Sequence, residues 1–151
     1  MLPLLKQTTL YINTEAASPM YALVRSPTNL SPKELGSIIV GDTMNLVIIP
    51  IDSDGSTNAA AGSAQYRIKA AIGTLGSTPL ALNNNNFYGS ASLHWTGSIN
   101  TNTGSLINAV TGDTLSTYLE IELTASGSLA DSGSRYTILQ APLTVRNQIL
   151  T

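Results

Sequence analysis

The stretch Leu119-Glu120-Ile121-Glu122-Leu123-Thr124 alternates apolar and polar side chains without interruption. Successive side chains of a β-strand point to opposite faces, so a period of two buries one face and leaves the other in water. The stretch therefore predicts a half-buried β-strand, because a helix cannot satisfy that period. Similar signals recur at residues 44–51, 66–72, 91–99, 135–138 and 143–146.

Strand signals at this spacing, separated by turn residues, are typical of a sandwich or a barrel. Met44–Ile51 is apolar at nearly every position, which indicates a central strand or one buried on both faces. Pro142 indicates a bend or an edge that divides the last strand into two. Only residues 103–112 indicate a helix, one or two turns long, capped by Thr103 or Ser105. We predict an all-β fold: an Ig-like antiparallel β-sandwich with one short helix, spanning residues 36–151.

The first 35 residues differ from the rest, because four prolines interrupt every short apolar stretch. These are Pro3, Pro19, Pro27 and Pro32. Thr8–Ile12 and Met20–Arg25 are compatible with short strands, but neither has a clearly polar face. We predict that residues 1–35 form an extended N-terminal arm that contacts a partner or another copy of the chain.

Charged side chains make up only 11% of the 151 residues, and the net charge is −2. A typical domain carries roughly 25% charged residues, so Ser, Thr, Asn and Gly must cover much of this surface. The seven Lys and Arg are scattered and form no basic stripe for a phosphate backbone, so we expect no nucleic-acid partner. Low net charge also leaves little repulsion between copies, which favours a homo-oligomer.

Cysteine is absent, which excludes a disulfide framework, a thiolate metal site and a cysteine nucleophile. No apolar run approaches the roughly 18 residues of a membrane span. Lys6 interrupts the apolar start Met1–Leu5 before a signal-peptide core can form. We expect a soluble protein made in a bacterial cytoplasm, with no cofactor and no membrane partner.

The residues that suggest catalysis have simpler interpretations. His94, the single histidine, faces away from the core by alternation, and no Gly-x-Ser-x-Gly elbow accompanies it. Glu120 and Glu122 project side by side from one strand, so they cannot flank a glycosidic bond. Asp52-Ser53-Asp54-Gly55 has calcium-loop character, but its glycine comes too early for an EF-hand and Ser63 stands where the bidentate Glu belongs. We therefore predict a hairpin turn between the strands at 44–51 and 64–72.

Several aromatic and apolar residues suggest binding instead. Trp95 lies in an apolar row and is interpreted as a core anchor rather than a sugar-stacking platform. Phe87 and Tyr88 follow an asparagine run in an expected loop, where an aromatic pair would be exposed. The candidate interface residues are Leu2, Leu4, Leu5, Tyr11, Asn85, Asn86, Phe87 and Tyr88.

Residues 41–147 share a series of motifs with a known family. The motifs are the entry Gly41-Asp42-Thr43, a Gly-rich hairpin from Asp52, an Ala-x-Tyr-x-Ile-x-Ala strand at 64–70, Trp95-Thr96-Gly97-Ser98-Ile99, Leu119-Glu120-Ile121-Glu122-Leu123, and the closing run 137–145. The segment resembles a β-sandwich module of phage tail, baseplate and fibre-attachment proteins, most closely the N-terminal domain of phage baseplate upper proteins. The resemblance implies oligomeric assembly and docking of other virion proteins, with no catalytic residue.

The chain departs from that family by ending at Thr151, soon after the predicted sandwich, with no receptor-binding domain or fibre stalk. This favours an adaptor, collar or anchor role in the virion over direct host recognition. Our first hypothesis is therefore a structural virion protein of a tailed phage or prophage, in the tail, baseplate, neck or fibre attachment, and not an enzyme. The alternative is a carbohydrate-binding β-sandwich module that uses Trp95, Tyr88 and nearby Asn side chains to recognise a host-surface glycan.

Overall fold

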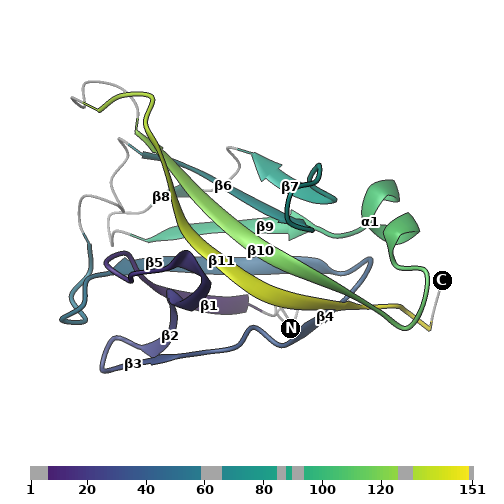
Figure 1. Cartoon of the computed structure of the whole chain (residues 1–151), viewed down its shortest axis with the longest axis horizontal. Helices are drawn as coiled ribbons and strands as arrows, with labels where there is room; N and C mark the ends of the chain where they lie inside the picture. The colour runs from purple at the N-terminus through teal and green to yellow at the C-terminus, as the bar shows by residue number, and fades with distance from the viewer. Residues whose placement is uncertain (1–6, 59–65, 85–87, 90–93, 126–130, 150–151) are drawn as a thin grey trace, which may run out of the picture.

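The structure is a computed structural model that describes residues 7–58, 66–84, 88–89, 94–125 and 131–149. In this part of the chain the strands form two sheets that pack face to face, with a short α-helix at one end (Figure 1). The predicted all-β sandwich with one short helix is confirmed.

Each sheet draws strands from distant parts of the chain. Sheet A has the order β3-β2-β1-β5-β9-β8, and sheet B has the order β4-β11-β10-β6-β7. The strands of sheet A are β1 (Gln7–Asn13), β2 (Leu23–Ser26), β3 (Asn29–Pro32), β5 (Thr43–Ile51), β8 (Tyr88–Gly89) and β9 (Trp95–Asn100). Those of sheet B are β4 (Ser37–Ile39), β6 (Tyr66–Gly73), β7 (Ala81–Asn84), β10 (Thr114–Ala125) and β11 (Arg135–Arg146).

Two strand pairings are parallel. β1 runs parallel to β5, in register from Gln7 opposite Asn45 to Asn13 opposite Ile51. β4 runs parallel to β11. The antiparallel part of the prediction therefore holds only for the remaining pairings, and both sheets are mixed.

The core lies between the sheets and is built by alternation along the strands. In β5, Met44, Leu46 and Ile48 are buried, while the side chains between them are only half-buried. In β10 the alternation of Leu119–Thr124 appears as predicted, with the apolar side chains inward. Burial of these apolar faces is the main contribution to the stability of the sandwich.

Residues 7–35, predicted as an arm, are part of the sandwich. β1 lies between β2 and β5 in sheet A, and its Leu10 and Ile12 are fully buried in the core. The turn after β1 adds Ala22 and Leu23 to the same core. The chain from Gln7 onward therefore does not form a separate segment.

The prolines of this region stand where a strand tolerates them. Pro19 begins the 3-10 helix η1 (Pro19–Tyr21), Pro27 lies in the turn between β2 and β3, and Pro32 ends the edge strand β3. None of these positions needs a backbone N–H inside a central strand pairing. The prolines of this region led us to predict an arm without long strands, but their positions are compatible with the paired strands β1, β2 and β3.

Pro142 does not divide the last strand, since β11 is continuous and pairs Pro142 with Tyr118 of β10. Thr144, two residues later, donates its N–H toward β4, to the carbonyl of Gly36. The nitrogen of Pro142 points to that same edge, before β4 begins, where no described strand pairs with it. Its missing N–H therefore removes no sheet hydrogen bond.

The predicted helix is present as α1 (Gly104–Ala109), and Thr103 is its N-cap. The hydroxyl of Thr103 accepts a hydrogen bond from the backbone N–H of Leu106 (3.2 Å) and donates one to the carbonyl of Leu80 (2.8 Å). Leu106 and Val110 are buried. One cap thus both starts the helix and fixes it to the chain before β7.

Asp52–Gly55 forms a turn, but the prediction that it joins two paired strands is wrong, because β5 lies in sheet A and β6 in sheet B. The turn is a local one that closes on an antiparallel bridge between Ile51 and Thr57. The N–H of Asp52 donates to the carbonyl of Ser56 (2.8 Å), and the N–H of Gly55 donates to the carbonyl of Asp52 (2.9 Å). Gly55 has φ +85°, and a Cβ at this position would lie 2.1 Å from the carbonyl oxygen of Pro27. The turn therefore needs glycine both for its backbone conformation and for its close packing on the β2–β3 turn.

Replacement of Gly55 by alanine should destabilise the fold more than the same change at Gly76. Gly76 also has a positive φ (+76°), but a Cβ there would meet nothing within 4 Å, so Gly76→Ala carries only the backbone strain. That strain is about 1–2 kcal/mol. Gly55→Ala carries the same strain and, in addition, forces the new Cβ and the carbonyl of Pro27 to move apart. Urea unfolding of both variants measures the difference, and equal losses would show that the close approach at Gly55 has no effect.

Candidate interface

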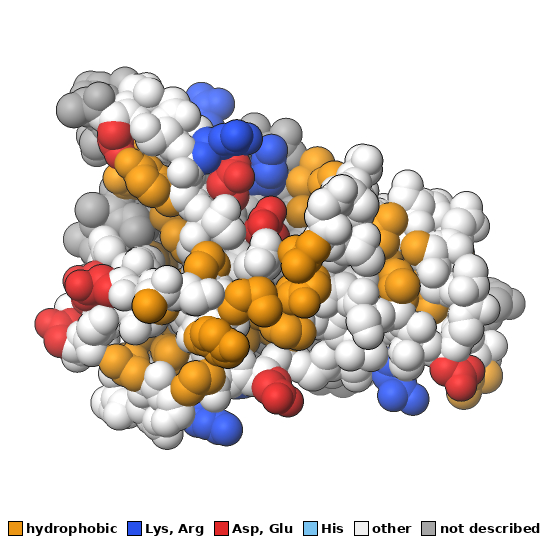
Figure 2. Space-filling view, in the orientation of Figure 1, with side chains coloured by type: hydrophobic (Ala, Val, Ile, Leu, Met, Phe, Trp, Pro, Cys, Tyr) orange, Lys and Arg blue, Asp and Glu red, His pale blue; other side chains and the backbone are white. Residues whose placement is uncertain are grey.

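An open hollow lies on the outer side of β11, and both apolar residues and the charged residues Lys33, Glu34 and Arg146 line it. It has a volume of about 730 Å³ and is bounded by η1, the connection from β3 to β4, and β11. Its apolar lining residues are Met20, Tyr21, Pro32, Leu35, Ala141 and Pro142. Figure 2 shows hydrophobic side chains gathered over this side of the molecule.

The most exposed aromatic side chain among the described residues belongs to Tyr21, of which 68% is accessible. The Ser18 hydroxyl accepts a hydrogen bond from the N–H of Met20 (3.3 Å) and so caps η1, which also has proline at its start. The short helix presents Tyr21 outward while the next residues, Ala22 and Leu23, enter the core. The capped helix η1 therefore leaves the large side chain of Tyr21 exposed to solvent.

Apolar side chains continue from this hollow across the middle of sheet B. Pro142 of β11 stands opposite Tyr118 of β10, and Tyr118 in turn stands opposite Gly73 of β6. Leu75, 56% exposed, lines a smaller hollow of about 140 Å³ together with Tyr118. We call the set Tyr21, Leu75, Tyr118 and Pro142 the apolar band.

The far end of the same face, toward the β10–β11 turn, is charged (Figure 2). Glu122 stands opposite Lys69, and Thr124 stands between Arg67 and Arg135. Glu120 accepts a hydrogen bond from the side-chain amide of Gln140 (3.0 Å). The two glutamates therefore share an outer face with cations, as the sequence predicted, and do not flank a cleft.

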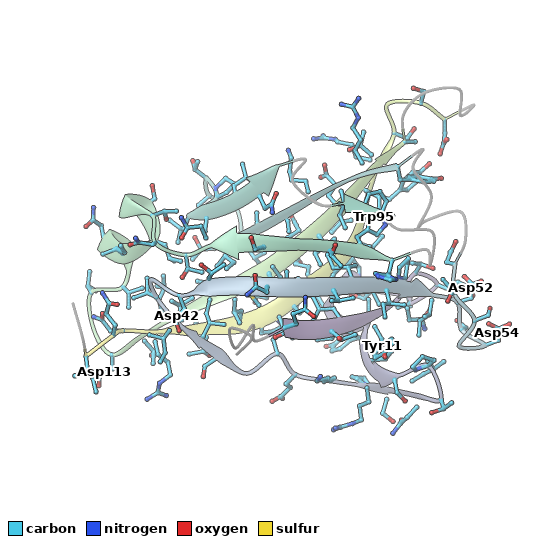
Figure 3. All side chains as sticks on the ribbon, turned by 180° about the vertical axis from the view of Figure 1, so that it is seen from behind. Tyr11, Asp42, Asp52, Asp54, Trp95 and Asp113 are labelled. Carbon is cyan, nitrogen blue, oxygen red and sulfur yellow. The ribbon has the colours of Figure 1, made fainter. Side chains whose placement is uncertain are left out.

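The described carboxylates do not converge on one site. Figure 3 places Asp52 and Asp54 at one end of the sandwich and Asp42 and Asp113 at the other. Within the described ranges no three His, Cys, Asp or Glu side chains are close enough to hold a metal ion. Instead the carboxylates serve the turns; for example, Glu15 accepts a hydrogen bond from the N–H of Ser53 (2.7 Å).

Asp54 is held as a carboxylate by its neighbour. Its Oδ1 accepts hydrogen bonds from the Ser56 hydroxyl (2.6 Å) and from the Ser56 N–H (2.9 Å). The hydroxyl bond, and then the backbone bond, lower the pKa of Asp54 below its ordinary value. Calcium-loop chemistry is not needed to explain this residue, since the ionised carboxylate stabilises the turn.

Trp95 is the core anchor that the alternation predicted. Only 5% of its surface is exposed, and it packs in the core cluster (Figure 3). Its indole N–H is buried without a hydrogen-bond partner among the described residues. His94, directly before β9, is half-buried. Trp95 therefore cannot serve as the sugar-stacking platform that the alternative hypothesis requires.

Of the predicted interface residues, the structure describes Tyr11 and the backbone of Tyr88. Tyr11 is half-buried in β1, between the inward Leu10 and Ile12, so it lies on the outer face of sheet A, away from the apolar band (Figure 3). Tyr88 is in β8, where only its backbone is described. Leu2, Leu4, Leu5, Asn85, Asn86 and Phe87 lie outside the described residues.

The asparagine run, interpreted as a loop from residue 83, begins inside a strand. Asn83 belongs to β7 and is buried, and its side-chain amide donates to the carbonyl of Ser98 in β9. This hydrogen bond joins the edge of sheet B to sheet A. The sequence did not predict this hydrogen bond, because asparagine is typical of turns. Its partner, the carbonyl of Ser98, is a backbone group that no sequence motif near Asn83 indicates.

No protein-family model matches the chain, and no curated protein matches its sequence. Among the described residues, no helix has the length and apolar character needed to cross a membrane. Function is therefore inferred from the chemistry of the chain's own surface.

Ser56→Ala should raise the pKa of Asp54 toward its ordinary value, because the hydroxyl makes the larger contribution to lowering it. A lowered pKa in the folded state stabilises the fold above the ordinary carboxyl pKa, and this contribution is lost as the pH falls through the lowered pKa. The variant should therefore lose less stability on acidification. An NMR titration of the carboxyl carbons measures the shift, with Ser53→Ala as control, and an unchanged pKa in Ser56→Ala would contradict the assignment.

Proposed function

We propose that the chain is a structural component of a tailed phage or prophage particle, which acts by assembling with other copies and docking other virion proteins. The observation that carries the proposal is the apolar band, in which Tyr21, Leu75 and Pro142 are exposed and Tyr118 is half-buried. The motifs of residues 41–147 that resemble the phage baseplate module support the choice of particle.

An exposed apolar band favours association because burying it removes apolar surface from water, worth about 25 cal/mol per Å². Tyr21 and Pro142 suit this role further, since proline loses no rotamer freedom on burial and tyrosine loses little. Neighbouring strands hold Tyr118 and Pro142 in place before any partner arrives. Little of the binding energy would therefore be spent on ordering the surface.

The low charge of the chain supports the same proposal. With a net charge of −2, copies repel one another weakly at neutral pH. Charged side chains border the band: Glu122 and Lys69 stand opposite each other at one end. Glu120 lines the smaller hollow, and Lys33, Glu34 and Arg146 line the larger one. Such an arrangement, an apolar centre with a polar surround, is typical of protein interfaces.

The double variant Tyr21→Ser, Pro142→Ser should weaken self-association of the full chain at least tenfold. A tenfold change corresponds to about 1.4 kcal/mol, a modest value for losing a central aromatic residue from an interface. Multi-angle light scattering over a range of concentrations measures it. Ile107→Ser is the matched control, because Ile107 is an exposed apolar residue on α1, outside the band. Equal association of both variants and the parent would exclude the band as the contact.

The particle itself provides the second test. Gradient-purified virions, from the phage or induced prophage whose genome encodes the chain, should contain it at a fixed ratio to the other structural proteins when measured by quantitative mass spectrometry. A chain found only in the lysate, and absent from intact particles, would overturn the proposed function.

A further inference from the structure

β4 presents an open edge of sheet B. It pairs with β11 on one side, where Val40 N–H donates to the carbonyl of Arg146 (2.9 Å) and the carbonyl of Gly36 accepts from Thr144. Backbone groups of alternate residues in a strand point to opposite edges, so Ser37 and Ile39 direct theirs away from β11. No other strand of the described chain pairs with β4 there. Within the described chain, this edge therefore offers the N–H and carbonyl of Ser37 and the N–H of Ile39, while the Ile39 carbonyl accepts a hydrogen bond from Asp42 N–H (3.2 Å).

Hollows lined by both apolar and polar residues lie on both faces of this edge. The outer one is the 730 Å³ hollow beside Pro142 and Tyr21, and Leu35 and Ser37 also line it. The inner one, of about 300 Å³, lies toward sheet A. Its lining includes the apolar residues Leu35, Ile38, Ile39 and Met44 and the charged residues Asp42 and Arg146. A strand added beside β4 would place alternate side chains in the two hollows, which is how edge addition combines backbone hydrogen bonds with side-chain selection.

Two of the other three described sheet edges, β7 and β3, are less available. Asn83 ties β7, the opposite edge of sheet B, to β9 through its hydrogen bond to Ser98. β3, an edge of sheet A, ends in Pro32, which cannot donate a backbone hydrogen bond. β4 has no such protection, because its residues are Ser37, Ile38 and Ile39, with 45% of Ile39 exposed.

We propose that the open edge of β4 accepts residues 1–6 of a second copy of the chain as an added strand. This inference rests on the proposed assembly function and names one of its contacts. The segment, Met1-Leu2-Pro3-Leu4-Leu5-Lys6, is apolar at its first five positions, which suits the apolar lining residues of the two hollows. Fully extended, six residues span about 20 Å, which is more than the three residues of β4 need.

The sequence of the segment suits this edge. Pro3 lacks an N–H and disfavours a helix, but it is tolerated in an edge strand when its nitrogen faces away from the partner. If Leu2 and Leu4 direct their backbone groups to β4, Pro3 directs its nitrogen to the solvent side. The side chains of Leu2 and Leu4 then enter one hollow, and those of Pro3 and Leu5 the other.

A second copy fits better than the segment's own chain. β1 is parallel to β5 and begins with Gln7 opposite Asn45, so at Gln7 the chain comes from the Asp42 end of the sandwich. β4 runs toward that same end and enters a turn closed by the hydrogen bond from Asp42 N–H to the carbonyl of Ile39 (3.2 Å). To lie beside its own β4 the segment would have to reverse direction, and a four-residue turn leaves too few of its residues to pair.

Two full-chain edge variants test the contact. Ile39→Lys places a charge on the open edge and should weaken self-association at least tenfold in sedimentation velocity runs. Leu82→Lys is the matched control, because Leu82 is 47% exposed on β7, the opposite edge strand of sheet B, and it should leave association unchanged. Circular dichroism and urea unfolding establish that both variants are folded.

The absence of cysteine allows a direct test by disulfide formation, because each introduced thiol is then unique. Leu4→Cys and Ser37→Cys are made in separate full-length chains and mixed under mild oxidation, with Leu82→Cys replacing Ser37→Cys as control. The proposal expects a mixed dimer with Ser37→Cys, at least tenfold more abundant than with Leu82→Cys. A chain carrying both Leu4→Cys and Ser37→Cys should likewise link to its neighbours.

Other outcomes overturn the inference in distinguishable ways. A disulfide formed only within one doubly substituted chain would show that the segment folds back on its own β4. If Ile39→Lys still associates, and Leu4→Cys forms no more mixed dimer with Ser37→Cys than with Leu82→Cys, strand addition at β4 is excluded. Assembly through the apolar band would remain possible in that case. If the chain is monomeric at every concentration, the strand-addition contact is excluded. If the chain is also absent from purified particles, the proposed function is excluded as well.

Discussion

The parallel pairing of β1 with β5 determines how the rest of the chain is arranged. Parallel neighbours cannot be joined by a tight turn, so the chain needs a long connection to return to the start of β5. Residues 14–42 form that connection, which places β2 and β3 beside β1 and then crosses to the other sheet as β4. The position of β4 at the edge of sheet B is therefore a consequence of the pairing of β1 with β5 in sheet A.

This arrangement makes the two lateral sides of the sandwich different. On one side Asn83 joins β7 to β9, and the Thr103 hydroxyl holds the carbonyl of Leu80. On the other side the crossing connection leaves β4 short, with a hollow on each face and Tyr21 exposed nearby. Apolar surface and free backbone groups thus gather where the chain changes sheets, and the molecule has one side better suited to association than the other.

Alternation allowed the sequence to predict strand positions and faces, including the inward Trp95 and the outward Glu120. Alternation could not predict which strands pair with each other, because it gives the face of each side chain but neither the neighbouring strand nor whether that strand runs parallel or antiparallel. Pro142 was expected to divide β11, and only the extent of β4 shows that its missing N–H faces an unpaired edge. The exposed Tyr21 was also unpredictable, since a proline-rich stretch does not reveal that η1 turns one residue outward.

The pairing of β4 with β11 also has a consequence during synthesis. β4 is made early, but its partner is the last strand of the described chain to leave the ribosome. Until then both edges of β4 lack a partner, and contacts between such distant residues form slowly. Sheet B can therefore be completed only when the last strand of the described chain is available, so the order of translation delays the closing of this side of the sandwich.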